Sequence, residues 1–467
     1  MNLLKLVTAN SALPFPETRI PASSSSAPNG LKLGAIFLAV IIASPFRESE
    51  SDSAYSVRAI GTYTCRMPSR LRWWILTLLF LGTTVNYLDR IILGILLPEI
   101  RKEIPIDDIL YGKISAAFQF AYTIGFLLAG KLIDKVGTRL GYSGAILWWS
   151  LAAAAHSLIR SPLSFGACRA LLGLGEAGNF PAAIKSVSEW FPKKDRAFAT
   201  GIFNAGSNIA TMIGPVMFVH LTERYGWRTC FLLTAASGLV VLVLWFFTKT
   251  TPPVQDDEDP NAPKLSWTQV AAYRQTWGFA LAKFFSDPVW WFYIFWLPPY
   301  FYDVRHFDMK QVAWAFPFIY LMADVGSVMG GWLSGYFMRL GWETGKARKV
   351  TMGIFAGCMP IAATSVLFDN SLIAIGLISL ATAAHQGWSA NLYTTVSDVF
   401  PKSAVASATG IGASLGGLGG VIFSTLLPGY IVTYFGYGPM FCIMGGFHLI
   451  GLYFVNRFMG DLKPITP

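Results

Sequence analysis

Seven charged side chains lie within long apolar segments of the sequence. They are Asp89, Arg90, Arg169, Glu176, Lys283, Asp287 and Asp324. At membrane depth an ionisable group costs about 2.5 to 3.5 kcal/mol on insertion scales, and it usually faces a cavity or a partner. A carboxyl group that exchanges a cationic partner for a proton can couple proton binding to anion binding. We therefore expect a proton-linked anion site, with a static ion network as the alternative.

The spacing in the first half predicts which of these groups act together. Arg169 and Glu176 stand seven residues apart, which is two helical turns and about 10.5 Å along the axis. They cannot pair tightly with each other, but they can flank a third group. Asp89 and Arg90 are the candidates for that group. In the static alternative, these charges only join two neighbouring segments.

Further candidates lie in the later apolar segments. Lys283 and Asp287 stand at i and i+4, so they form either a plain helical ion pair or a second charged wall of a cavity. Trp290 and Trp291 occupy the middle of their segment, which favours stacking on a sugar ring over an interfacial belt, with simple packing as the alternative. The polar residues that could bind hydroxyl groups from the opposite wall are Asn391 and His385. The histidine could equally be a packing residue.

The composition shows what kind of element must hold these groups. Hydrophobic residues make up 54% of the 467 positions and charged residues only 13%, about half the charge of a soluble domain. This argues against a soluble enzyme and predicts an all-α integral membrane protein with twelve transmembrane helices. We expect the spans at 73–97, 111–133, 142–159, 162–187, 199–221, 229–247, 277–302, 312–337, 351–368, 372–396, 405–434 and 438–455.

The distribution of basic residues predicts the orientation. Lys and Arg number eighteen on the side of the first flank and seven on the opposite side. By the positive-inside rule, both termini then lie in the cytoplasm and the protein is a multi-pass protein of the inner membrane. The same asymmetry accounts for the net charge of +10 without a nucleic-acid partner. The expected partners are the lipid bilayer and a small anionic substrate, with the protein itself monomeric.

An internal repeat predicts two six-helix bundles. Residues 189–202 and 398–411 follow the fourth and tenth spans and are identical at 8 of 14 positions. We expect an N-terminal bundle at 67–248, a Pro-rich acidic cytoplasmic linker at 249–276 and a C-terminal bundle at 277–467. Residues 1–66 read as a leader that is disordered or not translated, with Met67 as the true start. In such a repeat, a substrate site forms between the halves near the bilayer midplane.

Several motifs resemble a known family. Residues 130–139, Gly-Lys-Leu-Ile-Asp-Lys-Val-Gly-Thr-Arg, resemble the loop signature of the major facilitator superfamily. Residues 86–90 and 169–176 are similar to its anion:cation symporter branch. Residues 287–298, 323–332 and 385–391 are most similar to bacterial hexuronate transporters. The resemblance covers the chain from residue 67 onward.

This resemblance implies a role for individual residues. Asp89 and Glu176 would be protonation sites with Arg169 as their switching partner. Arg90 would contact the substrate carboxylate, Tyr122 would face the substrate from the second span, and Asn391 would be a polar ligand from the C-terminal half. The residue pattern itself adds Lys283 as a second cation for the carboxylate, and His385, Trp290 and Trp291 as further substrate contacts. Asp134 and Arg139 would belong to a cytoplasmic gating latch.

We therefore expect a proton-coupled symporter that imports hexuronates such as glucuronate or galacturonate by alternating access. We expect no enzymatic activity and no cofactor or metal. The expected coupling ion is a proton, with sodium as the alternative. One alternative is a secondary transporter of another organic anion, such as an aldonate, glucarate or an aromatic acid. A membrane-embedded enzyme is a weaker alternative, because the loops are too short to carry a catalytic constellation.

Overall fold

The computed structural model describes residues 69–191, 193–248 and 266–465, and every element in these ranges is helical. The expected leader at 1–66 and most of the expected linker at 249–276 lie outside the described residues. The first half of the described chain contains α2 (Ser69–Arg101), α3 (Asp108–Val136), α4 (Thr138–Ala155), α5 (Pro162–Glu176), α6 (Asn179–Trp190), α7 (Lys193–Tyr225) and α8 (Trp227–Phe247), with a short 3-10 turn, η2 (His156–Leu158).

The second half repeats this pattern after the short helix α9 (Trp267–Ala272). Each of the twelve expected spans falls on a helix or on a broken helix, which confirms the predicted all-α class. Span four is divided into α5 and α6, and span eleven contains a π-helical turn. The elements are α10 (Arg274–Asp303), α11 (Met309–Arg339), α12 (Thr344–Ala363), η3 (Thr364–Leu367), α13 (Ser371–Val399), α14 (Lys402–Gly419), η4 (Gly420–Leu426), α15 (Leu427–Phe435) and α16 (Gly438–Met459).

Seven stretches of the described helices combine the length and hydropathy of a membrane span. They are Arg70–Arg101, Ala199–Tyr225, Trp227–Phe247, Met309–Arg339, Thr344–Leu367, Ser407–Phe435 and Gly438–Met459. Other expected spans fall short for visible reasons, because α5 and α6 are 15 and 12 residues long. Helix α10 carries the charged residues Lys283 and Asp287 and three prolines in its interior. Helices α5 and α10, which carry Glu176, Lys283 and Asp287, thus depart from a plain apolar span.

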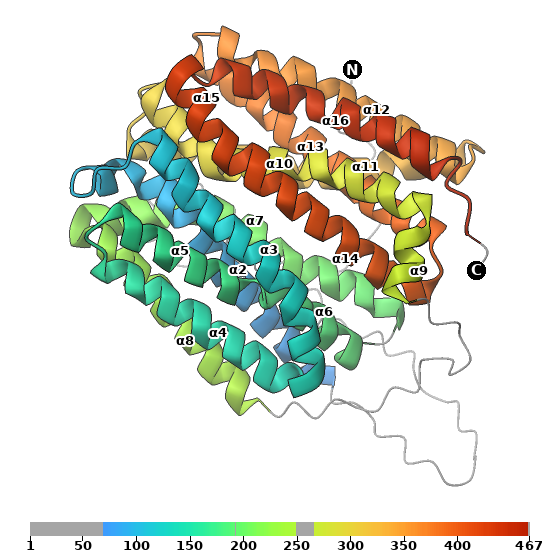
Figure 1. Ribbon diagram of the computed structural model, residues 1–467, viewed down its shortest axis with the longest axis horizontal. Helices are drawn as coiled ribbons and strands as arrows, with labels where there is room; N and C mark the ends of the chain where they lie inside the picture. The colour runs from blue at the N-terminus through green and yellow to red at the C-terminus, as the bar shows by residue number, and fades with distance from the viewer. Residues whose placement is uncertain (1–68, 192, 249–265, 466–467) are drawn as a thin grey trace, which may run out of the picture. The chain divides into compact units, whose positions relative to one another are not determined.

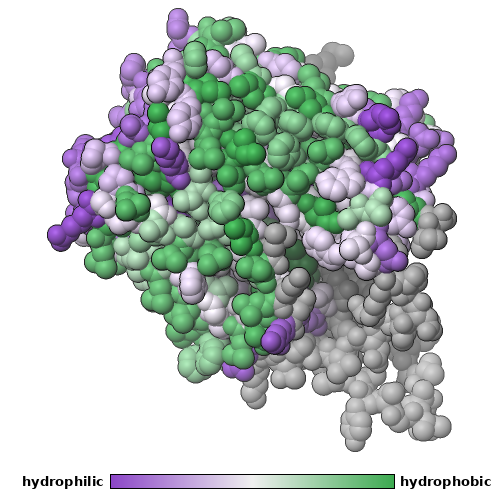
Figure 2. All heavy atoms as spheres, in the orientation of Figure 1, coloured by the Kyte–Doolittle hydropathy of each residue, from purple (hydrophilic) through white to green (hydrophobic). Residues whose placement is uncertain are grey.

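The surface has the character expected of a lipid-facing protein. Figure 2 shows hydrophobic residues over the middle of the visible face and hydrophilic residues largely at its margins. Large apolar side chains are exposed along several helices, among them Leu128, Val240 and Val328. In water this exposure would be costly, whereas lipid tails solvate it readily.

The packing of the helices brings distant segments together. Helix α2 lies against α7 and α8, and α10 lies against α14 and α16 (Figure 1). Across the two halves, α7 contacts α11, α2 contacts α10, and α3 contacts α14, η4 and α15. Helix α5 approaches α3 and α4 closely because Gly173 and Gly175 have no side chain: a Cβ at either position would overlap Phe118 or Trp148. This close approach sets the depth of Glu176 at the end of α5.

Candidate functional site

A buried ion pair joins α2 to α5. Both Nε and Nη2 of Arg90 donate to the same carboxylate oxygen, Oε2 of Glu176, at 3.0 and 2.8 Å. The Nη2 group also donates to Oδ1 of Asn86, one turn earlier on α2, at 3.3 Å. Both charged side chains are 0% exposed. A charge-assisted bond of this kind in a dry environment is strong, and removing either partner leaves a buried charge unpaired.

Aromatic rings surround the guanidinium of Arg90. Its Cζ lies 4.6 Å from the ring centroid of Tyr87, 4.5 Å from Tyr122, 5.3 Å from Phe118 and 5.0 Å from Trp291. The first three rings belong to α2 and α3, whereas Trp291 belongs to α10 of the other half. Arg90 is therefore held by cation–π contacts at the meeting point of the two halves.

Arg90 also keeps a spare donor. Among the described residues, its Nη1 group and the Oε1 atom of Glu176 have no hydrogen-bond partner. A small cavity with room for about one water molecule adjoins this group and is lined by Arg90, Leu93, Ser115, Phe118, Arg169 and Phe295. Because a guanidinium has five N–H donors, Arg90 could bind an anion here while it still holds Glu176.

The structure assigns Arg169 a different neighbour from the one expected. Its Nη1 donates to the backbone carbonyl of Asp89 at 2.9 Å, and Glu176 pairs with Arg90 instead. Within the described chain, neither carboxylate oxygen of Asp89 has a hydrogen-bond partner. The hydroxyl of nearby Thr234 donates to the carbonyl of Phe231. The Asp89 side chain thus lies inside the first bundle, toward α8, and is 0% exposed.

A second ion pair lies on α10. Lys283 Nζ is 2.7 Å from Oδ2 and 3.0 Å from Oδ1 of Asp287, four residues on. The same ammonium donates to the hydroxyl of Tyr393 on α13 at 2.8 Å. The two residues form the i, i+4 pair that was one of the two expectations, and the tyrosine adds a contact from another helix.

The aromatic and polar candidates of the second half are engaged mainly with one another. Trp290 stacks on His385 with ring centroids 5.5 Å apart, and Nδ1 of His385 lies 3.2 Å from Nε2 of His448 on α16. Both N–H donors of the Asn391 amide are taken by the backbone carbonyls of Gly330 and Gly387. In this conformation His385 and Asn391 therefore bind helices α16, α11 and α13, whereas Trp291 faces Arg90.

The expected gating residues lie at the junction of α3 and α4. Asp134 belongs to α3, but its side chain lies outside the described part of the structure. The Nη2 group of Arg139 donates to the carbonyl of Phe246 at 2.6 Å and packs over its ring. Arg139 thus caps the end of α8 within the first half.

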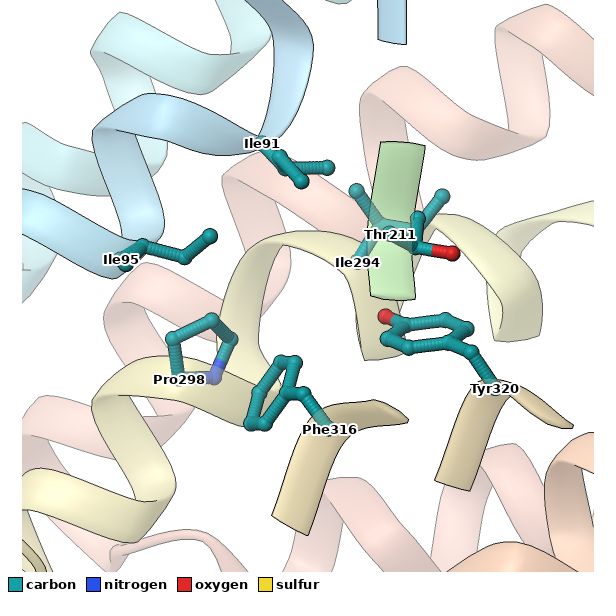
Figure 3. A pocket seen from close by; sticks show the side chains of 7 residues that line it. All are labelled: Ile91, Ile95, Thr211, Ile294, Pro298, Phe316 and Tyr320. Carbon is teal, nitrogen blue, oxygen red and sulfur yellow. The ribbon is translucent and has the colours of Figure 1, made fainter. Parts of the chain in front are cut away.

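The two halves close over the charged groups. Arg101 and Asp303, at the ends of α2 and α10, lie 3.5 Å apart, and the hydroxyl of Tyr302 donates to the carbonyl of Ile95. Farther along the interface, Asn208 of α7 donates to Asp324 of α11. An apolar cavity of about one water molecule remains between the halves, lined by Ile91, Ile95, Thr211, Ile294, Pro298, Phe316 and Tyr320 (Figure 3). The two halves are therefore in contact on the side of Arg101 and Asp303 and around this cavity.

Four residues that contact the site were not among the candidates predicted from the sequence. Tyr393, His448, Phe118 and Asn208 carry no charge at neutral pH, so a search for buried charge passes over them. His448 could have been found as a lone histidine in the last apolar segment, and Tyr393 by its position two residues after Asn391. The pairing of each residue depends on helix rotation, which the sequence does not display.

Comparison with known proteins places the chain among transporters. The Major Facilitator Superfamily matches residues 79–424. The chain is 32% identical over 399 residues to the hexuronate transporter of Escherichia coli (strain K12), covering 82% of this chain and 92% of that protein. It is 30% identical over 329 residues to the galacturonate transporter of Dickeya chrysanthemi, covering 67% of this chain and 95% of that protein.

A solved structure supports the same fold. The crystal structure of a bacterial homologue of the human lysosomal transporter Spinster, in an inward-facing and occupied conformation, matches with a TM-score of 0.64. Sequence identity is 18%, and the match covers 84% of this chain and 96% of that chain. With its helical bundles, its buried charges and these matches, the chain belongs to the major facilitator superfamily and is a multi-pass membrane transporter, not an enzyme.

Proposed function

We propose that the protein is a proton-coupled symporter that imports hexuronates, such as glucuronate or galacturonate, by alternating access. The observation that carries this proposal is the Arg90–Glu176 pair, buried where the two halves meet and adjoined by an unpaired Nη1 donor. The relatives named for hexuronate and galacturonate transport support the same class of substrate.

The geometry supports a simple order of events. A sugar carboxylate approaches the spare donor of Arg90 and forms a charge-assisted hydrogen bond. Two anions then compete for one guanidinium in a site of low dielectric, which favours protonation of Glu176. Protonation in turn releases Arg90 toward the substrate, so that each binding event strengthens the other. A bound anion and a bound proton together leave the charge of the site unchanged.

The remaining candidates take supporting parts. Trp291 and Tyr122 both pack on the guanidinium, with their ring centroids 6.3 Å apart, and supply apolar ring faces for the sugar. Arg169 holds the backbone carbonyl of Asp89 and so sets the position of α2 relative to α5. Asp89, sealed in the first bundle, exchanges a proton only when the helices around it separate.

We further infer that the termini face the cytoplasm of a cell with an inner membrane, that the monomer is the working unit and that no cofactor takes part. The positive-inside asymmetry supports the orientation. The contacts of Arg101 with Asp303 would then lie on the outer side, and substrate entry from that side requires them to open. The buried central charges need no redox group or metal for this cycle.

Uptake into proteoliposomes tests the proposal. Purified protein should accumulate radiolabelled galacturonate when an inward proton gradient is imposed, and should not accumulate it without the gradient. Glu176→Gln should abolish accumulation and spare counterflow exchange, because a neutral amide mimics the protonated acid. Glu99→Gln, which removes a carboxylate of α2 that pairs with Lys102, is the matched control. Loss of both activities in Glu176→Gln alone would assign Glu176 to folding or binding.

Another organic anion is the second candidate substrate. The guanidinium of Arg90 favours a carboxylate, but the cavity beside it has room for only about one water molecule and does not define the rest of the substrate. Competition of galacturonate uptake by an aldonate, by glucarate and by an aromatic acid ranks these substrates directly. An aldonate that competes better than galacturonate would replace the hexuronate as the proposed substrate.

A further inference from the structure

The ammonium of Lys283 is enclosed by its partners. It donates one hydrogen bond to Oδ1 of Asp287 and one to the hydroxyl of Tyr393, and it lies 2.7 Å from Oδ2 of Asp287. Two of its three N–H donors are therefore used in hydrogen bonds, and the Asp287 carboxylate faces the ammonium with both oxygens. The side chain is only 2% exposed. An anion can therefore bind Lys283 only after Asp287 releases it.

The Asp287 carboxylate is the accessible member of the pair. Its side chain is 21% exposed, and the neighbouring Tyr393 is 44% exposed. Helix α14 packs directly against it through Gly416, where any Cβ would overlap the carboxylate. Asp287 is thus the more exposed member of the pair, while Lys283 stays covered by Phe279 and Gly412.

The second cation lies in line with the first. Lys283, Asp287 and Trp291 follow one another at intervals of four residues on one face of α10. Since Arg90 packs on Trp291, Lys283 lies about 12 Å along the helix axis from the level of Arg90, and Asp287 about 6 Å. Both long basic side chains can reach into this interval, which suits an extended six-carbon chain with a carboxylate at each end.

The charges around the pair are few. On its own helix Asp287 faces Lys283, and α14 contacts the pair through Gly412 and Gly416. Helix α13 presents Tyr393 to the pair, and it carries His385 within electrostatic range of Lys283. Beyond Trp291 lies the Arg90–Glu176 pair, which is neutral as a unit. A second substrate carboxylate placed here would meet the Asp287 carboxylate at short range, and the repulsion is relieved when Asp287 takes up a proton.

We propose that Lys283 is a second carboxylate-binding position, masked by Asp287, which opens for a six-carbon dicarboxylate when Asp287 is protonated. This inference rests on the proposed function and extends it to a further substrate class. One proton on Glu176 accompanies the first carboxylate, and one on Asp287 accompanies the second. The site therefore takes up one proton for each carboxylate of its substrate.

The experiment compares two substrates that differ in one end group. Galacturonate has one carboxylate, and galactarate has the same carbon chain with two. Initial uptake rates of both are measured in proteoliposomes across neutral to mildly acidic pH, where both acids remain ionised. For the wild type, the ratio of kcat/KM for galactarate to that for galacturonate should rise as the pH falls. Asp287→Asn should raise this ratio at neutral pH about tenfold and make it independent of pH.

Two further variants separate this effect from a general disturbance. Lys283→Met combined with Asp287→Asn removes both charges, which a folded bundle tolerates better than one unpaired charge, and should return the ratio to the wild-type value or below. Asp461→Asn is the matched control, because Asp461 is 77% exposed and lies near Lys463, beyond the end of α16. It should leave the ratio and its pH dependence unchanged.

The outcomes distinguish the two proposals. Two results would overturn the masked second position in proteins that still take up galacturonate. One is an unchanged ratio in Asp287→Asn, and the other is an equal rise of the ratio in the double variant. If the wild type accumulates neither sugar acid, the proposed function itself fails. Elution as a single monodisperse species in detergent shows that each variant has folded.

Discussion

The two ion pairs of the interface differ in how they are built. Arg90 and Glu176 belong to different helices, α2 and α5, and both side chains are 0% exposed. Lys283 and Asp287 belong to one helix, and the carboxylate is 21% exposed. Arg90 retains an unpaired donor group in the described structure, whereas the ammonium of Lys283 is enclosed by both oxygens of Asp287 and by the Tyr393 hydroxyl.

Because of this difference, the two ion pairs should respond to different events. A pair between two helices is altered when those helices shift, so it can link a proton to a movement of the bundle. A pair within one rigid helix moves as a unit and changes only when a proton or a ligand displaces one partner. The first pair is therefore suited to coupling, and the second to selecting the substrate.

Replacing the arginine of the first pair should have the largest effect. In Arg90→Lys the ammonium lacks the planar fork, so it cannot hold Glu176 and Asn86 and still present a free donor. We expect galacturonate uptake to fall by about 100-fold or more, equivalent to about 2.7 kcal/mol. Initial rates in proteoliposomes measure the loss. Arg228→Lys, at a 36% exposed arginine that pairs with Glu103 outside the site, is the control, and an equal loss there would contradict the special role of Arg90.

The next test concerns Trp291, the ring of the second half that packs on Arg90. Trp291→Leu removes the cation–π contact that crosses the interface, worth about 2 kcal/mol in a desolvated site. We expect KM for galacturonate to rise about tenfold. Trp290→Leu is the neighbouring control, because its ring stacks on His385 and not on Arg90. A larger rise for Trp290→Leu would move the binding surface toward the histidine pair.

The smallest effect is expected at the histidine pair. His448→Gln removes the ring nitrogen that lies 3.2 Å from His385, so His385 and the stacked Trp290 lose a positional constraint. We expect KM to rise about threefold with little change in kcat, since a neutral hydrogen bond contributes about 1 kcal/mol or less. Counterflow at several substrate concentrations separates the two constants. A lowered melting temperature with KM unchanged would show that the pair serves packing alone.

Much of the helical architecture could be predicted because apolar runs must satisfy their backbone groups internally when they cross lipid. All twelve expected spans coincide with helical segments in the described chain. The breaks were harder to predict, since the interruption between α5 and α6 and the π turn η4 each lie inside a single expected span. Close packing through glycine, as at Gly173 against Phe118, shapes α5 there and involves residues distant in the chain.

The chain by itself determined which side chains are charged and that they lie at membrane depth, because hydropathy and charge are properties of single residues and short windows. Only the tertiary structure decided which partner each charge has. It paired Glu176 with Arg90 and directed Arg169 to a backbone carbonyl, and it brought Tyr393 to Lys283 and His448 to His385. The physical reason is that a pairing depends on the rotation and depth of two helices packed together, and many distant contacts set these jointly.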